Sequence, residues 1–140
     1  MINKFIKILL LILFIPNISY AKSEYFQEGV GLYNIKKFED AKFKFQQDIL
    51  FNPKNELSYL YLSKIFNKQK KIDLEEKNLN TVMLLNPKNE EAIYYLAKLK
   101  LNLSDYSKSK ELNKKLKLVC KNFCSQSDKL KFEIENLSKK

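Results

Sequence analysis

The sequence predicts an all-α protein built as a stack of helical hairpins, and three observations support this fold class. Its 140 residues include 2 Gly and 3 Pro, too few for the tight turns of a β-sandwich or barrel, whereas the abundant Leu, Lys and Glu favour helices. Apolar residues recur at helical spacing. The segment Asn52 to Glu56 recurs letter for letter as Asn86 to Glu90, an offset of 34 residues (86 minus 52). A fixed period of this length indicates stacked helical units.

The first 21 residues have the features of a secretory signal peptide. Two lysines precede an apolar run from Ile8 to Ile15, and Ser19 and Ala21 are small residues suited to cleavage after Ala21. The run is too short to span a bilayer core of about 30 Å, although an uncleaved membrane anchor is the alternative interpretation. We therefore expect residues 1–21 to be removed and the protein to be exported to the periplasm, with residues 22–140 as one domain.

The formal net charge of +10 comes from 26 lysines, because the sequence contains neither Arg nor His. Without the two lysines of the signal peptide the charge is +8 (10 minus 2). Without His, the protein lacks the side chain that ordinarily acts as a general base near neutral pH and the imidazole that binds metal ions. Without Arg, it lacks the guanidinium group that forms paired hydrogen bonds with phosphate groups and with the base edges of nucleic acids. Glu75 and Glu76 are adjacent and point in different directions on a helix, so they form no catalytic pair. We expect a non-enzymatic protein with no cofactor or metal and, since it is exported, no nucleic-acid partner.

Cys120 and Cys124 are the only two cysteines in the sequence. In an oxidising compartment such a pair more often forms a disulfide than a metal or redox site, and two cysteines without His cannot complete a zinc shell. The sulfurs of a continuous helix would be poorly placed at this spacing, so a disulfide requires the helix to end near Lys121 to Phe123. Two unpaired thiols remain the alternative.

One unit of the repeat is a helix, a short turn and a second helix. Between the two copies of the repeated segment lie two stretches with helical apolar spacing, Ser58–Asn67 and Ile72–Leu85, separated by the charged segment Lys68–Lys71. A Pro at the end of each unit cannot continue a helix, and the Asn two residues later can cap the next one. The positions that repeat are Tyr25, Gly29, Leu32, Phe38, Ala41 and Phe45, then Tyr59, Leu62, Ser63, Phe66, Leu79 and Val82, then Ile93, Leu96, Ala97, Tyr106, Ser109 and Leu116.

This pattern resembles the tetratricopeptide repeat (TPR), most closely at Phe38-Glu39-Asp40-Ala41 followed by Asn52-Pro53. Gly29, Ser63 and Ala97 share the small position at which the two helices of a unit approach each other. The resemblance runs from the predicted cleavage site to the first cysteine and is typical of small exported bacterial TPR proteins. It implies a right-handed superhelical stack of about three helix-turn-helix repeats, at about residues 22–55, 56–89 and 90–121, plus a C-terminal capping helix.

Five residues depart from the TPR pattern. Glu75 stands where the family has Ala, and Asp48 where it has a small apolar residue. Lys100 and Asn113 occupy positions of large apolar residues, and Lys121 stands where a third Pro would be. The third unit is therefore the least regular.

A capping helix is expected over about residues 126–138. Ser125-Gln126-Ser127-Asp128 has the form of a capping box, and Leu130, Ile134 and Leu137 follow at helical spacing with polar residues between them. A solenoid needs such an end piece to cover its last apolar face.

The resemblance implies a protein interaction module or scaffold that binds a partner segment in the concave groove lined by the first helix of each unit. Aromatic and basic residues alternate there, which favours an acidic or carboxylate-ended protein or peptide partner, although ordinary lysine-rich surface is the alternative. Some TPR proteins hold the terminal carboxylate of a partner with a clamp of two Lys and two Asn. In this sequence Val30 stands at one of the polar positions of that clamp. The predicted groove residues are Phe26, Val30, Tyr33, Asn34, Leu60, Lys64, Asn67, Lys68, Tyr94, Lys98 and Asn102.

A second function is a basic envelope-attachment protein held electrostatically to anionic lipid or cell-wall polymer. It would use the +8 charge and contact a membrane surface. Binding of this kind should collapse steeply with salt, whereas groove recognition should weaken moderately.

Overall fold

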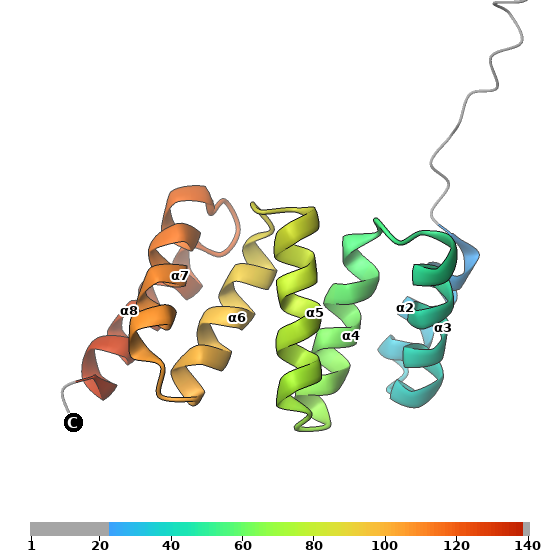
Figure 1. Cartoon of the computed structure of the whole chain (residues 1–140), viewed down its shortest axis with the longest axis horizontal. Coiled ribbons are helices and arrows are strands. Elements are labelled where there is room, and N and C mark those ends of the chain that lie inside the picture. Colours follow the sequence, from blue (N-terminus) through green and yellow to red (C-terminus); the bar gives the residue numbers. More distant parts are fainter. Residues whose placement is uncertain (1–22, 139–140) are drawn as a thin grey trace, which may run out of the picture.

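The computed structural model describes residues 23–138, which form seven helices and no strand and confirm the all-α fold class (Figure 1). The predicted signal peptide, residues 1–21, lies outside the described residues. Three hairpins follow one another along the long axis, and the last helix packs at the far end (Figure 1). The helices are α2 (Glu24–Asn34), α3 (Phe38–Phe51), α4 (Glu56–Lys68), α5 (Ile72–Leu85), α6 (Glu90–Asn102), α7 (Tyr106–Val119) and α8 (Cys124–Leu137).

The helix bounds repeat with the 34-residue period of the sequence. The second helices of the hairpins, α3, α5 and α7, each contain 14 residues and begin at Phe38, Ile72 and Tyr106. The helices α4, α6 and α8 begin at Glu56, Glu90 and Cys124. The capping helix α8 therefore occupies the place of the first helix of a fourth unit.

Asparagine caps start α4 and α6, as the sequence predicts. The side chain of Asn55 accepts a hydrogen bond from the Leu57 N–H (3.3 Å), and that of Asn89 from the Ala92 N–H (3.0 Å). The capping box predicted for α8 is wrong, because α8 begins at Cys124 and has no side-chain cap. Ser127 lies inside its first turn.

The turn within each hairpin contains a non-glycine residue in the left-handed conformation. Lys36, Lys70 and Ser104 have φ angles of 64°, 57° and 60°, and they again lie 34 residues apart. A side chain in this region is strained, because its Cβ approaches the following carbonyl oxygen. The backbone N–H of Lys70 donates to the Asn67 carbonyl (3.0 Å) and that of Lys71 to the Phe66 carbonyl (2.9 Å), which closes α4 before α5 begins.

The core runs along the stack as two clusters of buried apolar side chains. The first joins α2, α3 and α4, and the fully buried ring of Phe45 lies within it. The second joins α4 to α8 and includes Leu79, Ile93 and Leu116, which are also fully buried. Burial of apolar area of this kind is the main stabilising term for a repeat stack, in which each unit contacts only its neighbours.

Carboxylates hold the junctions between successive hairpins. At the first junction, buried Asp48 accepts hydrogen bonds from Asn52 (3.1 Å), Asn55 (2.7 Å) and Ser58. Burial acts to raise the pKa of Asp48, but the interaction with Ser23, followed by the hydrogen bonds from Ser58, Asn52 and Asn55, outweighs burial and leaves the pKa below its ordinary value. At the second junction, Glu56 accepts from Asn86 (2.6 Å) and Asn89 (3.4 Å). The two copies of the Asn-Pro-Lys-Asn segment thus bind different carboxylates.

Two further departures from the TPR pattern, Lys100 and Asn113, also have polar partners. Lys100 forms an ion pair with Glu76 (2.6 Å). Asn113 donates to the Ser127 carbonyl (3.0 Å) and accepts from the Ser127 hydroxyl (2.9 Å). Because each polar group is satisfied, these positions do not disrupt the stack.

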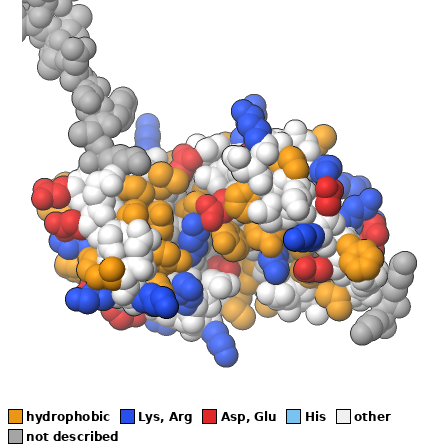
Figure 2. Space-filling view, turned by 180° about the vertical axis from the view of Figure 1, so that it is seen from behind, with side chains coloured by type: hydrophobic (Ala, Val, Ile, Leu, Met, Phe, Trp, Pro, Cys, Tyr) orange, Lys and Arg blue, Asp and Glu red, His pale blue; other side chains and the backbone are white. Residues whose placement is uncertain are grey.

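On one face of the molecule (Figure 2), lysines are spread along the stack rather than gathered in one patch. On the face shown in Figure 2, lysines lie beside acidic and apolar side chains along the whole stack. Within the described residues, no helix combines the length and the apolar character that crossing a membrane requires.

Candidate partner-binding groove

A small polar pocket lies among the first helices of the hairpins, where the groove is predicted. Its volume is about 100 Å³. Tyr33 comes from α2 and Tyr95 from α6, so the pocket spans all three hairpins. Four of the predicted groove residues line it. The full lining is Tyr33, Ser63, Lys64, Asn67, Lys68, Glu75 and Tyr95.

Two of the predicted groove residues belong to the core instead. Phe26 is 3% exposed and packs edge-on against Tyr61 (ring centroids 5.9 Å apart) and against Phe45. Leu60 is 2% exposed and belongs to the cluster that joins α4 to α8. Their assignment to a partner-contacting surface is therefore wrong, because the neighbouring hairpin covers this side of each first helix.

Glu75 is a nearly buried carboxylate at the floor of the pocket. Both of its oxygens accept hydrogen bonds from the amide of Asn67, at 3.0 and 3.1 Å. Burial raises the pKa of Glu75, and the Asn67 hydrogen bond opposes this only in part. No lysine forms an ion pair with this carboxylate among the described residues, so the pocket contains a strong hydrogen-bond acceptor that its surroundings do not neutralise.

The lysines of the groove differ in what they contact. Lys64 bridges α4 and α6 through an ion pair with Glu91 (2.7 Å), and its ammonium also lies 4.8 Å from the centre of the Tyr61 ring. The Lys68 ammonium lies 5.2 Å from the centre of the Phe38 ring. Lys68 and Lys98 form no ion pair with another described residue, so they carry the positive charge available to a partner.

Two tyrosines frame the pocket as neutral hydrogen-bonding groups. Tyr33 packs edge-on against Phe38 (5.4 Å) and Tyr61 (5.1 Å), which fixes its ring. Burial, and then the nearby Tyr61, raises the pKa of Tyr33, while burial and then Glu91 raises that of Tyr95. Both phenols therefore keep their protons at neutral pH and can donate to a ligand.

The other predicted groove residues do not line the pocket. Tyr94 packs against Tyr95 (ring centroids 5.5 Å apart) and against Phe123 (5.6 Å), at the start of the capping region. Lys98 is half-buried, and Asn34 and Asn102 are exposed. The half-buried Val30 packs against the first core cluster.

Sequence reasoning missed three pocket residues. The repeat pattern places Ser63 at the small position between two helices, and it indicates Tyr94 rather than the neighbouring Tyr95 as the groove residue. Glu75 departs from the TPR pattern, and the pattern does not indicate that it reaches the pocket. The charge of Glu75 itself indicates a place in the site, because a charged residue at a position that normally packs between helices must reach solvent or a polar partner.

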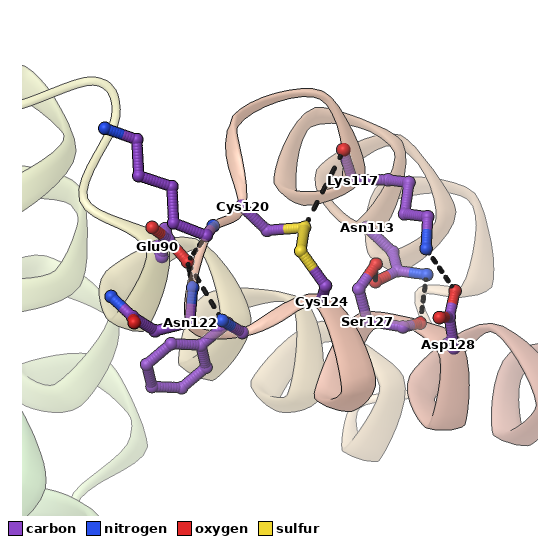
Figure 3. The surroundings of a disulfide bond; sticks show 10 residues. Glu90, Asn113, Lys117, Cys120, Asn122, Cys124, Ser127 and Asp128 are labelled. Carbon is purple, nitrogen blue, oxygen red and sulfur yellow. Dashed lines mark hydrogen bonds and ion pairs between the residues drawn. A yellow bond between two sulfur atoms is a disulfide. The ribbon is translucent and has the colours of Figure 1, made fainter.

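Cys120 and Cys124 form a disulfide in the structure, with Cα atoms 5.3 Å apart (Figure 3). The bond closes the segment between α7 and α8, so the helix ends between the cysteines as a disulfide requires. Glu90 accepts hydrogen bonds from the backbone N–H groups of Lys121 (2.8 Å), Asn122 (2.9 Å) and Phe123 (2.9 Å). The Phe123 hydrogen bond, followed by that from Lys121, lowers the pKa of Glu90.

A larger cleft of about 450 Å³ lies between α7 and α8 and is lined by residues of both helices. The apolar side chains of Tyr106 and Ile134 line this cleft, together with Lys110, Lys114 and Lys131. Within the described residues it is a surface feature of the capping region, separate from the groove. No group of three or more His, Cys, Asp or Glu suited to a metal ion occurs among residues 23–138.

Searches of family models and of curated proteins gave no match to this chain. Solved structures do match it. The TPR2B domain of yeast Sti1, solved as a pHsp70 complex, superposes with a TM-score of 0.75 at 13% identity, over 81% of this chain and 95% of that one. The first TPR of Spaghetti (RPAP3), bound to the HSP90 peptide SRMEEVD, superposes with a TM-score of 0.72 at 15% identity, over 81% of this chain and 90% of that one.

A bacterial protein is similarly close. The Yersinia enterocolitica type III secretion chaperone SycD, in complex with a peptide of the translocator YopD, gives a TM-score of 0.73 at 16% identity, over 84% of this chain and 93% of that one. The hairpins, their period and these superpositions together show that the chain has the TPR fold.

Proposed function

We propose that this protein is a non-catalytic interaction module of the bacterial cell envelope, which holds a segment of a partner protein in the groove of α2, α4 and α6. The observation that carries the proposal is the pocket among the three hairpins, in which Tyr33, Lys68, Glu75 and Tyr95 place donors and an acceptor around one small cavity. TPR structures of similar shape were solved with peptides or partner proteins bound, which supports this use of the fold.

The chemistry of the pocket suits a small polar side chain of the partner. About 100 Å³ holds a few water molecules or one hydroxyl or amide group. Such a group can donate to Glu75 and accept from Tyr33 or Tyr95. Lys68 and Lys98 favour acidic residues in the flanking parts of the segment, and they would act mainly on the rate and orientation of binding. The peptide in the Spaghetti complex, SRMEEVD, is acidic in this way.

Photocrosslinking from the groove in intact cells tests the proposal. A crosslinking residue at Asn34 or Asn102, both exposed and predicted to flank the groove, should capture one partner reproducibly. The affinity of the captured segment is then measured with Tyr95→Phe, which removes one hydroxyl and should weaken binding about fivefold. The double change Lys68→Glu with Lys98→Glu should slow association.

Matched controls are Lys110→Glu and Lys129→Glu, exposed lysines on α7 and α8 that change the net charge equally. These variants should bind the segment nearly as the natural protein does. Equal losses from the groove and control lysines, with no effect of Tyr95→Phe, would contradict groove recognition and favour diffuse electrostatic attachment.

A further inference from the structure

Three leucines at one position of the repeat are almost fully exposed. Leu50, Leu84 and Leu118 are 79%, 82% and 87% exposed. Each is the thirteenth of the 14 residues of its helix, α3, α5 or α7. Since these helices are equivalent elements of successive hairpins, the three side chains follow one line along the stack, here named the leucine ladder.

The leucine ladder has no role in the fold or in the groove. Its members belong to neither core cluster, and none of them lines the pocket, whose residues come from α2, α4, α5 and α6. Single exposed leucines are common on protein surfaces. Recurrence in all three hairpins makes this a regular row of exposed apolar side chains, and exposed Phe43 lies two turns before Leu50 on α3.

Lysines without ion pairs flank the ladder. Lys54 and Lys88 follow Leu50 and Leu84 by four residues, Lys77 lies two turns before Leu84, and Lys115 one turn before Leu118. None of these lysines forms an ion pair with another described residue.

The C-terminal halves of α3, α5 and α7 themselves carry few acidic residues, while Glu56 and Glu90, at the starts of α4 and α6, are engaged in hydrogen bonds. The last seven residues of α3, α5 and α7 contain one acidic residue, Asp48, and it is buried with its hydrogen bonds satisfied. The exposed acids Glu39 and Asp73 lie in the first turns of α3 and α5, and Glu111 lies in the second turn of α7, so all three are in the half of the helix away from the ladder. The ladder surface therefore combines exposed apolar side chains with lysines that form no ion pair with another described residue.

We propose that the leucine ladder docks the protein on an anionic lipid bilayer. Leucines in a row can enter the boundary between headgroups and acyl chains, while the flanking lysines lie among anionic headgroups. Charge complementarity selects this occupant: a second copy of the chain would bring the same lysines face to face, which disfavours self-association. Docking through the second helices leaves the groove of the first helices open to a protein partner.

Tryptophan fluorescence provides a reporter for each position, because the sequence contains no Trp. In the full chain, Leu84→Trp creates a single reporter on the ladder, and Asn102→Trp creates the control on α6. With vesicles of phosphatidylcholine and phosphatidylglycerol, emission from the Leu84→Trp protein should shift to shorter wavelength and be quenched by brominated acyl chains. Emission from the Asn102→Trp protein should not change. The reporter thus separates contact at the ladder from attachment elsewhere in the chain.

Charge variants in the Leu84→Trp background complete the test. Lys54→Glu with Lys88→Glu should weaken vesicle binding by at least about fivefold per lysine. Lys36→Glu with Lys129→Glu, which changes the net charge equally away from the ladder, should have a smaller effect. Leu50→Ser with Leu118→Ser should reduce binding about tenfold, whereas Ile35→Ser with Leu103→Ser, at the hairpin turns, should not.

Several outcomes would overturn the proposal. Equal quenching of the two reporters, or none at either, would show that the ladder is not the contact surface. Equal losses from the two lysine pairs would assign the attraction to net charge alone. A shift of the Leu84→Trp emission that depends on protein concentration, without vesicles, would identify the ladder as a contact between copies of the chain.

Discussion

A Cβ atom added to Gly29 would lie 2.8 Å from Cε1 of the Phe45 ring, closer than real side chains approach. The ring is fully buried and stacks on Tyr61 (centroids 4.9 Å apart), so it cannot simply move aside. We predict that Gly29→Ala destabilises the protein by about 1–3 kcal/mol, as overpacking in a core does. Chemical denaturation measures this change.

The other hairpins provide the control for that prediction. The second hairpin has Ser63 at the position of Gly29, and it has the smaller Leu79 at the position of Phe45. The double variant Gly29→Ala with Phe45→Leu should therefore be more stable than the sum of the two single effects predicts. Additive losses would show that the Gly29–Phe45 contact is not the cause.

The left-handed turn residues predict a stabilising substitution. Lys70 has a φ of 57° in the turn between α4 and α5, where Gly is free of the Cβ clash. Relief of this strain, less the entropy that Gly loses on folding, should make Lys70→Gly more stable by roughly 0.5–1 kcal/mol. Thermal unfolding checks this, and Lys70→Ala is the control because it removes the charge and keeps the Cβ. Equal stability of the Gly and Ala variants would contradict the strain argument.

Replacement of the buried carboxylate of the pocket, Glu75, is predicted to stabilise the protein in a pH-dependent way. The pKa of Glu75 is raised in the folded state, so the native protein binds more protons than the unfolded chain between the two pKa values, and stability falls as pH rises through the folded pKa. Glu75→Gln removes this loss. The variant should be more stable than the natural protein at neutral pH, and the difference should vanish once pH falls below the unfolded pKa of about 4.3.

Urea unfolding of both proteins across this pH range measures the difference. Asp48→Asn is a useful contrast, because the pKa of Asp48 is lowered in the folded state. That carboxylate stabilises the fold above its ordinary pKa, and the contribution is lost as pH falls. Asp48→Asn should therefore be less stable at neutral pH, the opposite sign to Glu75→Gln.

The disulfide predicts a local effect at the end of the stack. Replacement of Cys120 and Cys124 with Ser opens a very short loop, which loop-entropy arithmetic values at about 2 kcal/mol. Because α8 packs against α6 and α7, the two helices of the last hairpin, hydrogen exchange should accelerate in α8 while the amides of α4 remain protected. A uniform loss of protection along the stack would instead show that the capping region supports the whole fold.

Local sequence patterns were sufficient to predict the helices and their period. The expected helix at residues 72–85 coincides with α5, and that at 58–67 lies within α4. Proline, asparagine caps and apolar spacing act within a few residues of the chain, so their structural consequences can be read from the sequence. The break of the helix between the two cysteines depends on equally local geometry.

Packing between hairpins decided which side chains form the candidate site. Phe26 and Leu60 occupy groove positions in the repeat, yet the next hairpin buries them, while Glu75 reaches the pocket from the second helix of its hairpin and Tyr95 from the next hairpin. The sequence specifies that each helix has an apolar face and a polar face, but the curvature of the stack determines how far a neighbour covers the boundary between them. Residues on that boundary become core or surface only when the hairpins pack together.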